Sequence, residues 1–487
     1  MTQICVTVTG RTMEEVRRAR DAAAGADIVE VRLDGVDRPD AGAALEGRRR
    51  PVIVTCRPRW EGGAFDGSED ERRQILLDAV SAGAEFVDVE LLAFCAMDIV
   101  RLRRGRGVIV SSHLFEPSTV DLAEQLRALR STGAEVVKLA VAVDSLAGTL
   151  PLFELGARAG RDQAEGQSHV LIGMGPRGVH TRVLAARLRN RWTYAGDGVA
   201  PGQIPASHLL EEFTFRRITP DAALYGVVGS PIAHSLSPAM HNAGFAQAGL
   251  DAAYVALDAK DAGDFVTFAQ AMAMRGASVT APLKVDMVAH VDDCDPLARD
   301  TGALNTIVMR DGHWSGYNTD VDGVVAPLAD RIELRGARVA ILGAGGAARA
   351  AAVGLRQAGA NVWLCARRAD RASAVAAAVR VRAGSFPPAP GSWDVLVNTI
   401  PSADGDESPI HGLPLAGSIV FDLAYTPEVT PLLAQARDAG CATVGGIEML
   451  TRQAERQFEL WTGGPPPRGL FRAAADAARA LKAGARL

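Results

Sequence analysis

Hydrophobic residues form short runs that recur at regular intervals through the first 200 residues. Segments rich in Ala, Leu, Arg and Glu, with a helical period, separate most of these runs. Alternation of strands and helices predicts an α/β fold, and eight strands predict a (β/α)8 barrel over residues 1–218. The eight runs are ICVTVT, DIVEVRLD, PVIVTCR, FVDVEL, GVIVSSHL, EVVKLAV, HVLIGMG and WTYAGD.

The same alternation continues after residue 223, but the chain there follows a different plan. The run RVAIL leads directly into a glycine-rich turn and then into an alanine-rich helix. We expect a second, two-lobed part after a boundary between residues 200 and 237. Its substrate lobe is predicted over 223–330 and is completed by helices over 448–487, and its nucleotide lobe over 331–447.

Composition and charge narrow the possible partners. The 487 residues are 48% hydrophobic with a net charge of −5, which is typical of a globular chain with no nucleic-acid or membrane-binding patch. The six cysteines are far apart, so we expect neither disulfides nor a metal site. No basic apolar leader or long apolar stretch is visible, and we expect a cytoplasmic protein whose partners are small molecules. The oligomeric state cannot be read from the sequence.

Lysine is rare in this chain. Of 52 basic residues only four are lysines, namely Lys138, Lys260, Lys284 and Lys482. Arginine stays protonated and cannot serve as an amine nucleophile, whereas a lysine can do so in a suitable environment. Lys138 and Lys284, which lie in apolar strand or loop contexts, are therefore candidates for catalysis.

The carboxyl ends of the predicted barrel strands carry many polar residues, and in such a barrel these ends form the active site. The apolar neighbours of Lys138 predict a desolvated amine that forms an imine with a carbonyl substrate. His113 is a candidate base, and Glu61 or Asp88 could set its tautomer. Arg57 and Arg182 could clamp a substrate carboxylate. Other polar residues at or near these strand ends are Glu30, Arg32, Asp34 and Glu90.

The first half of the chain resembles type I 3-dehydroquinate dehydratase from about residue 4 to residue 215. The resemblance is carried by EVRLD, TCR followed by EGG, SSHLFEPS, VVKLAV, GMGPRG and APGQI, in that order. It implies that Lys138 forms an imine with the substrate ketone and His113 removes the adjacent proton, so that loss of water gives 3-dehydroshikimate. It also implies that Glu61 orients His113. The implied substrate-binding residues are Glu30, Arg32, Arg57, Arg182 and Gln203.

One position departs from the family pattern. The family usually has a serine four residues before the glutamine of PGQ, where this chain has Val199. A hydroxyl that would help hold the substrate over the lysine is therefore absent. An alternative hypothesis is that the first half is a weakly active binding or scaffold module.

Polar residues of the second half cluster in four segments. We expect Ser235 and Ser237 to lie on a loop shaped by flanking prolines. Lys284 follows a proline-containing turn, and Asn305 and Asp320 lie in GALNTIV and GYNTDVDG. A lysine and a carboxylate that meet in space can pass a proton to or from a substrate oxygen.

A dinucleotide-binding loop is the clearest motif of the second half. The strand before Gly343 leads into GxGxxA and then into a helix, so the glycines let the backbone approach a pyrophosphate. The next strand ends in Arg367 and Arg368, where an NAD-binding fold usually has an acid, and two arginines favour a 2′-phosphate and hence NADP. The predicted cofactor-binding residues are Gly343, Ala344, Gly345, Gly346, Ala347, Arg367 and Arg368.

These segments, together with WDVLVNTIPS, FDLAYTPEVTPLL and GGIEMLTRQAERQFELWTG, resemble shikimate dehydrogenase over residues 223–465. The resemblance implies a Lys284–Asp320 catalytic pair in a two-lobed shikimate dehydrogenase unit whose NADP lobe is Rossmann-type. With the TIM barrel expected before it, the whole chain is predicted to be α/β. Action on quinate, or with NAD, remains an alternative. The implied substrate-side residues are Ser235, Ser237, Thr280, Asn305, Asp320, Tyr425 and Gln453.

Overall fold

The computed structural model describes residues 1–116, 120–162, 166–401 and 407–484. The chain forms two compact units, Met1–Ala223 with Asp251–Ala271, and Leu224–Leu250 with Met272–Leu487. The ends of two predicted segments, Pro117 and Ser118 of SSHLFEPS and Ser402 of WDVLVNTIPS, lie outside the described residues, as do residues 485–487 of the predicted substrate lobe.

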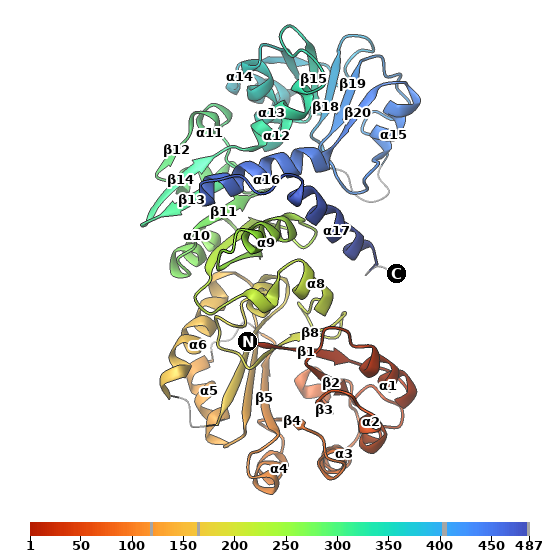
Figure 1. Ribbon diagram of the computed structural model, residues 1–487, viewed down its shortest axis with the longest axis vertical. Coiled ribbons are helices and arrows are strands. Elements are labelled where there is room, and N and C mark those ends of the chain that lie inside the picture. Colours follow the sequence, from red (N-terminus) through yellow and green to blue (C-terminus); the bar gives the residue numbers. More distant parts are fainter. Residues whose placement is uncertain (117–119, 163–165, 402–406, 485–487) are drawn as a thin grey trace. The chain divides into compact units, whose positions relative to one another are not determined.

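The first unit contains the predicted barrel of parallel strands, with its helices on the outside (Figure 1). Its strands have long buried runs because both faces of a parallel sheet are covered. The strand order is β7-β6-β5-β4-β3-β2-β1-β8. The strands are β1 (Gln3–Val8), β2 (Ile28–Arg32), β3 (Val52–Thr55), β4 (Phe86–Glu90), β5 (Val108–Leu114), β6 (Val136–Ala142), β7 (Ser168–Met174) and β8 (Trp192–Ala195).

Helix starts in the barrel follow local capping chemistry. Thr12 and Glu15 form a capping box at the first helix, and Ser68 and Glu71 form another at the third. The helices are α1 (Met13–Ala22), α2 (Ala41–Leu45), α3 (Glu69–Ser81), α4 (Ala96–Arg103), α5 (Leu122–Ser131), α6 (Leu150–Asp162), α7 (Val179–Val183) and α8 (Ala206–Glu211). Short 3-10 turns are η1 (Arg59–Glu61), η2 (Ala147–Thr149), η3 (Pro176–Gly178) and η4 (Phe215–Arg217).

The barrel closes between β7 and β8 without a strand ladder among the described residues. Instead, the Asn190 side-chain amide donates to the carbonyl of Leu171 and accepts from its N–H, both at 2.9 Å. The N–H of Arg191 donates to the carbonyl of His169 at 3.0 Å. The amide thus takes the place of a backbone partner. The fold class predicted from strand alternation is confirmed.

A second, mixed sheet has the strand order β10-β9-β11-β13-β14-β12. Its strands are β9 (Ala223–Gly229), β10 (Ala252–Asp258), β11 (Gly276–Val279), β12 (Asp293–Cys294), β13 (Thr306–Arg310) and β14 (His313–Tyr317). The helices of these segments, with those near the C-terminus, are α9 (Ser237–Gln247), α10 (Ala262–Ala271), η5 (Asp286–His290), α11 (Pro296–Thr301), α12 (Asp320–Ala329), α16 (Gly446–Thr462) and α17 (Leu470–Gly484).

A third sheet is parallel throughout and has the strand order β17-β16-β15-β18-β19-β20. The order reverses between β15 and β18, which is the arrangement of a Rossmann fold and marks the crevice where dinucleotides bind. The strands are β15 (Arg338–Leu342), β16 (Asn361–Cys365), β17 (Arg382–Gly384), β18 (Val395–Asn398), β19 (Ile419–Asp422) and β20 (Ala442–Gly445). Its helices are α13 (Gly346–Gln357), α14 (Ala369–Ala378) and α15 (Pro431–Asp438).

Apolar cores cover both faces of this third sheet. On one face Leu355 of α13 and Val375 of α14 pack with strand residues, and on the other Leu433 of α15 packs with Trp393. The sheet is therefore the middle of three layers, and the carboxyl ends of its strands remain available for a ligand.

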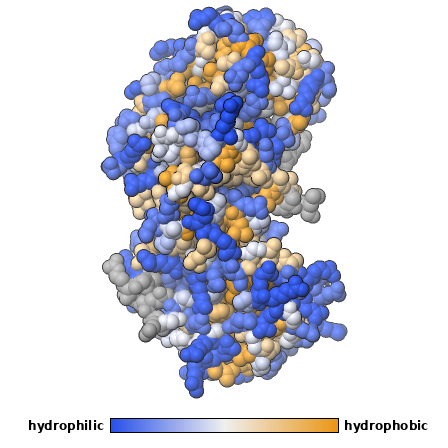
Figure 2. All heavy atoms as spheres, in the orientation of Figure 1, coloured by the Kyte–Doolittle hydropathy of each residue, from blue (hydrophilic) through white to orange (hydrophobic). Residues whose placement is uncertain are grey.

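Hydrophilic residues predominate on the face of the molecule drawn in Figure 2. Within the described ranges, none of the helices combines the length and the apolar composition that crossing a bilayer requires. In the same residues, no three or more His, Cys, Asp or Glu side chains are grouped as they would be to hold a metal ion.

Candidate active sites

The barrel interior places Lys138 among charged groups. Its Nζ lies 3.4 Å from an oxygen of Asp88 and 3.9 Å from an oxygen of Glu30, and it stands 4.3 Å from the centre of the Tyr194 ring. Lys138 is only 6% exposed, as its apolar sequence neighbours predict, but charged groups also lie beside it. Val137 and Leu139 point to the other face of β6, and the charged and aromatic residues beside the Lys138 side chain come from β2, β4 and β8.

Asp88 connects the lysine to Arg57. It accepts hydrogen bonds from Ser111 at 2.6 Å and from Arg57 at 3.0 Å. Burial opposes ionisation of Asp88, but Arg57 and then Lys138 hold its pKa below the usual value. Burial also opposes the charge of Arg57, yet the surrounding carboxylates raise its pKa. This buried network therefore keeps alternating charges next to the amine.

The network continues through Glu90, which the sequence places at a strand end, to two residues that the sequence did not indicate for a site. Arg57 donates to Glu90 at 2.7 Å, and Glu90 also pairs with the fully buried Arg72 of α3. Arg72 in turn donates to Glu69 at 2.6 Å. In VDVEL, Asp88 and Glu90 are two residues apart, so their side chains are expected on the same face of the strand. Nothing in the sequence around Arg72 indicates its contact with Glu90.

His113 and Glu61 form a hydrogen-bonded pair at the end of β5. Nδ1 of His113 lies 2.7 Å from Oε2 of Glu61, and the backbone N–H of His113 donates to the same oxygen at 2.9 Å. Burial raises the pKa of Glu61 to about 7. Burial, and then the positive charge of Arg57, hold the pKa of His113 well below its usual range. The imidazole is therefore neutral, and Nε2 is left to face a substrate.

The predicted substrate arginines differ in their partners. Arg32 is held by both oxygens of Asp34 at 2.7 Å, and Arg57 has the partners described above. Arg182, only 3% exposed, donates only to the carbonyls of Tyr194 and Pro201, and its Nε has no hydrogen-bond partner among the described residues. Burial lowers the pKa of Arg182 to about 10. Its guanidinium thus has capacity for an anionic ligand.

The segment after β8 brings Gln203 to the amino-terminal strand. Its side chain donates to the Thr7 hydroxyl at 3.2 Å, and Thr7 donates to Glu30 at 2.9 Å. Val199 precedes it in a half-buried position and offers no hydroxyl. Gln203 is therefore linked to the lysine cluster through Thr7 and Glu30.

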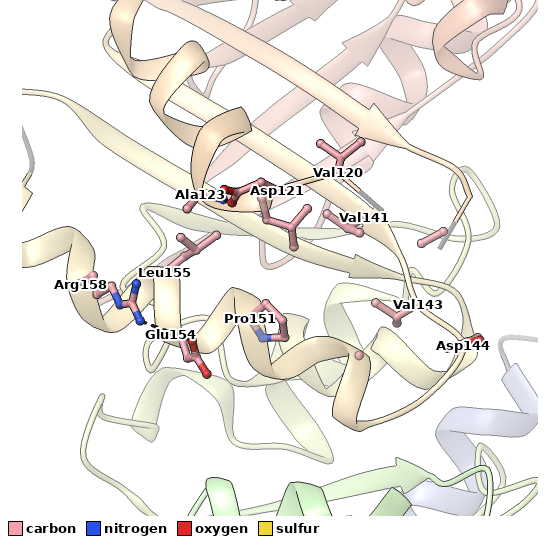
Figure 3. A pocket seen from close by; sticks show the side chains of 13 residues that line it. Val120, Asp121, Ala123, Val141, Val143, Asp144, Pro151, Glu154, Leu155 and Arg158 are labelled. Carbon is pink, nitrogen blue, oxygen red and sulfur yellow. Dashed lines mark hydrogen bonds and ion pairs between the residues drawn. The ribbon is translucent and has the colours of Figure 1, made fainter. Parts of the chain in front are cut away.

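A cavity of about 550 Å³ lies elsewhere, beside α5 and α6 on the outside of the barrel strands (Figure 3). Val141 and Val143 line it with Pro151, and Glu154 pairs with Arg158 at its edge. None of the predicted site residues lines this cavity. We therefore locate the candidate site by the side-chain network rather than by the cavity.

Lys284 and Asp320 form the centre of a second cluster. Nζ of Lys284 donates to Oδ2 of Asp320 at 2.5 Å. The Asn305 amide donates to Asp320 at 2.8 Å and to Gln453 at 3.2 Å, so it fixes the carboxylate from the other side. Asp320 is the first residue of α12, where a carboxylate is stabilised by the helix dipole. Four predicted residues thus meet in one cluster.

The other predicted substrate residues of this half make no hydrogen bond to the Lys284–Asp320 cluster among the described residues. Thr280 follows β11, and Tyr425, whose pKa is raised by burial, follows β19. The Ser237 N–H donates to the Ser235 hydroxyl at 3.2 Å. The expectation that Ser237 lies on a loop is wrong: it is the first residue of α9, because Pro238 is well tolerated in the first turn of a helix.

The turn between β15 and α13 fits a dinucleotide. Gly343 has a φ of +118°, and a Cβ there would stand 2.3 Å from the Thr399 hydroxyl, so glycine is required. Space around Gly345 is open, and no side chain caps the start of α13. Ala344 lies in the same loop, and Ala347 lies in the first turn of α13. The backbone N–H groups of this helix start suit a pyrophosphate.

This turn also lies against the second catalytic cluster. A Cβ at Gly346 would stand 3.2 Å from the Lys284 side chain, so the lysine and the nucleotide turn are in close contact. After β16, Arg368 pairs with Asp370 at 2.9 Å, while Arg367 is exposed and has no carboxylate partner among the described residues. Of the two predicted arginines, Arg367 is the one available for a phosphate.

Three family models match the chain. Type I 3-dehydroquinase matches residues 4–220, the shikimate dehydrogenase substrate binding domain matches 227–307, and the shikimate 5′-dehydrogenase C-terminal domain matches 446–475. They cover the barrel cluster and, in the second cluster, Lys284, Asn305 and Gln453, while Asp320 lies between the matched ranges.

Individual relatives agree with these matches. The bifunctional 3-dehydroquinate dehydratase/shikimate dehydrogenase of Arabidopsis thaliana, named chloroplastic, is 33% identical over 509 residues, covering 96% of this chain and 83% of that relative. An NADP(+) shikimate dehydrogenase from an Anaeromyxobacter species is 41% identical over 275 residues, covering 53% of this chain and 97% of the relative. A crystal structure of shikimate dehydrogenase with NADP+ superposes with a TM-score of 0.50 at 31% identity, covering 54% of this chain and 97% of that one.

The similarity to the plant relative extends over both parts of the chain, at an identity and coverage that only common ancestry produces. With two lysine-centred clusters, a barrel and a Rossmann lobe, the chain belongs to the family of bifunctional 3-dehydroquinate dehydratase/shikimate dehydrogenases.

Proposed function

We propose that this chain catalyses two consecutive reactions. The barrel dehydrates 3-dehydroquinate to 3-dehydroshikimate, and the second half reduces 3-dehydroshikimate to shikimate with NADPH. The observation that carries this proposal is the pair of lysines, each held by a carboxylate in its own unit, in a chain with only four lysines among 52 basic residues. Its likeness to the plant bifunctional relative over 96% of its length supports it.

In the barrel, the amine of Lys138 attacks the substrate ketone and water leaves to give an imine. The neutral His113 then takes the adjacent proton on Nε2, while its Nδ1–H remains bonded to Glu61. His113 returns this proton to the substrate hydroxyl, which leaves as water as the new double bond forms, and hydrolysis of the imine frees the lysine. Asp88 and Glu30 hold the lysine in place throughout.

Arg182 is the proposed partner of the substrate carboxylate. It is buried, it has an Nε without a partner, and it has no carboxylate of its own among the described residues. We propose that Gln203, whose side chain donates a hydrogen bond to Thr7, covers the same side of the site. Arg32 and Arg57 already have carboxylate partners. We therefore propose that these ion pairs shape the pocket and contact the substrate hydroxyls.

The pH dependence of dehydration should follow Glu61. Above its pKa of about 7, the carboxylate accepts the Nδ1–H of His113 and leaves Nε2 free as a base. Below that pH, protonated Glu61 donates to Nδ1, so the ring proton moves to Nε2 and the base is lost. We expect kcat/KM for dehydroquinate to fall about tenfold per pH unit below pH 7.

The measurement is a pH profile of dehydration for the wild type and for Glu61→Gln. The glutamine carbonyl still accepts from Nδ1–H but does not titrate in this range, so the variant should lose the fall at low pH. A wild-type profile that stays flat from pH 6 to pH 8 would contradict this assignment.

In the second site, the Lys284 ammonium donates a proton to the substrate ketone oxygen, and Asp320 holds that ammonium in position. Asn305 and Gln453 keep the Asp320 carboxylate oriented. The turn Gly343–Gly346 and the start of α13 would hold the pyrophosphate of NADP, and Arg367 its 2′-phosphate. When bound, NADPH supplies the hydride that the reduction needs.

Arg367 should determine the preference for NADP over NAD. We expect Arg367→Ala to lower the ratio of kcat/KM for NADP to that for NAD by about 10- to 100-fold, because it removes a charged hydrogen bond to the phosphate. Arg368→Ala is the matched control, since Arg368 is already paired with Asp370 and should change the ratio less. Equal effects of the two variants on this ratio would refute the assignment.

We further propose the domain limits 1–218 for the dehydratase, 223–330 with 448–487 for the substrate lobe, and 331–447 for the NADP lobe. The membership of strands in the three sheets supports these limits. We propose a cytoplasmic location, although the plant relative is named chloroplastic.

One coupled assay tests the proposed function. Dehydroquinate and NADPH are mixed with the full chain, and the nicotinamide absorbance is followed. We expect the absorbance to fall only when both sites are intact. If the absorbance does not change with dehydroquinate but falls with 3-dehydroshikimate, the barrel is a binding module and the first half of the proposal is wrong.

A further inference from the structure

Lys482 is one of the four lysines of the chain, and neither reaction uses it. It lies near the end of α17, and its Nζ donates to the backbone carbonyls of Ser235 at 2.8 Å and of Ala233 at 3.2 Å. These carbonyls belong to the turn that carries the proposed substrate hydroxyls. Lys482 therefore binds the backbone of the segment that contains Ser235 and Ser237.

At the start of the turn, the N–H of Ser230 donates to the carbonyl of Ala281 at 3.2 Å, and the bonds found around Ser235 among the described residues are otherwise local. The N–H of Ser235 donates to the carbonyl of Ile232 at 3.0 Å, and the Ser235 hydroxyl accepts from the Ser237 N–H at 3.2 Å. Both bonds join residues two or three apart in sequence, so they set the shape of the turn but not its position. Lys482 supplies a bond from 247 residues away.

The same helix holds a loop of the nucleotide lobe. Arg479 pairs with Glu428 at 3.0 Å, and Arg472 lies 3.8 Å from the other oxygen of Glu428. Asp476, between them on α17, accepts from both arginines. Glu428 stands three residues after Tyr425, another proposed substrate-side residue. One helix thus contacts two loops that carry site residues.

Apolar packing makes α17 a firm support for these contacts. Phe471 is fully buried, with its ring 5.6 Å from that of Phe458 and 5.2 Å from that of His241 on α9. Ala475 and Ala478 are buried on the same face. Helices α17 and α9 run side by side (Figure 1). The polar face of α17 is therefore held at a fixed distance from the turn that precedes α9.

We propose that α17 positions the substrate-binding loops of the second site, with Lys482 as the principal positioning residue for the Ser235–Ser237 turn. This inference rests on the proposed function. An ammonium suits the task, because its three donors rotate freely and can bind two neighbouring carbonyls of one turn, whereas a guanidinium presents a rigid fork. The Glu428 pairs are partly exposed and contribute less.

The test is the kinetics of Lys482→Met in the full chain. Loss of two charge-assisted hydrogen bonds should raise KM for shikimate about fivefold or more, because the serine hydroxyls are no longer held for the substrate. We expect kcat and KM for NADP to stay within about twofold, since the hydrogen bonds of Lys482 go to the backbone of Ala233 and Ser235 rather than to Lys284 or Asp320. Dehydration of dehydroquinate should not change.

Two variants complete the design. Lys482→Arg keeps the charge but not the paired geometry, so its KM for shikimate should lie between those of the wild type and Lys482→Met. Lys260→Met is the matched control, because Lys260 is exposed and its backbone N–H, not its side chain, makes the hydrogen bond to Asp264. It should behave as the wild type.

A Lys482→Met variant with the same KM for shikimate as Lys260→Met would overturn the inference while leaving the proposed function intact. Loss of dehydration together with shikimate oxidation would also overturn it, since that outcome reports general unfolding. If wild-type protein reduced no NADP with shikimate, the proposed function of the second half would fail, and the inference with it.

Discussion

Lys138→Arg is expected to abolish dehydration of 3-dehydroquinate, lowering kcat by more than about 10⁴-fold, while NADP-dependent oxidation of shikimate continues at the wild-type rate. Arginine stays protonated and has no free electron pair with which to attack the ketone. It keeps the positive charge between Asp88 and Glu30, so the buried network loses its nucleophile without losing its balance of charge. The variant should therefore lose the chemical step while keeping its folded structure.

Covalent trapping provides the direct measurement. Borohydride added with dehydroquinate reduces the imine to a stable amine, and mass spectrometry of the digested wild type should find the adduct on the peptide that contains Lys138. The arginine variant should carry none. An adduct on another lysine, or residual dehydration within tenfold of the wild-type rate, would mean that Lys138 is not the nucleophile. Shikimate oxidation by the same preparation shows that the chain is folded.

Lys284→Met is expected to have the reverse effect. Without the ammonium, no group beside Asp320 protonates the ketone oxygen, and general acid catalysis of this kind contributes about 10²–10⁴-fold to a rate. The kcat for reduction of 3-dehydroshikimate should fall by that factor. Dehydration should be unchanged, because Lys138 and its network lie in the other unit.

Asp320→Asn separates proton donation from binding in this site. The amide has a similar size but carries no charge and can accept from only one of Lys284 and Asn305, so it should reduce kcat more than it raises KM for 3-dehydroshikimate. Stopped-flow measurement of NADPH consumption with both variants gives the two parameters. If Lys284→Met kept more than about a tenth of the wild-type kcat, another group would have to be the acid.

The fold could be predicted from the sequence because its signals are local. Eight buried runs separated by helical segments have few solutions other than a closed parallel barrel, and the turn at Gly343 occurs where a strand meets a helix. The pairings of His113 with Glu61 and of Lys284 with Asp320 also follow family motifs. These features depend either on residues near one another in sequence or on motifs shared with the family.

The surroundings of each side chain were harder to predict because they depend on contacts between strands. Apolar neighbours in VVKLAV predict a desolvated amine, and Lys138 is buried, but the motif gives no sign that Asp88 and Glu30 lie beside it. Arg72 comes from a helix whose pattern gives no sign of its contact with Glu90. Lys482 likewise contacts a turn 247 residues earlier. Such contacts are properties of the folded chain.

The alternating charges beneath the first site have a consequence for how this protein can evolve. From Lys138 the series runs through Asp88, Arg57, Glu90 and Arg72, and its inner members each face opposite charges on two sides. Replacing one inner member strands its neighbours as buried, uncompensated ions, at a cost of about 3–5 kcal/mol. That is a large share of the stability of a domain. Descendants of this chain can therefore change the series only by coordinated substitutions, so its members are inherited together.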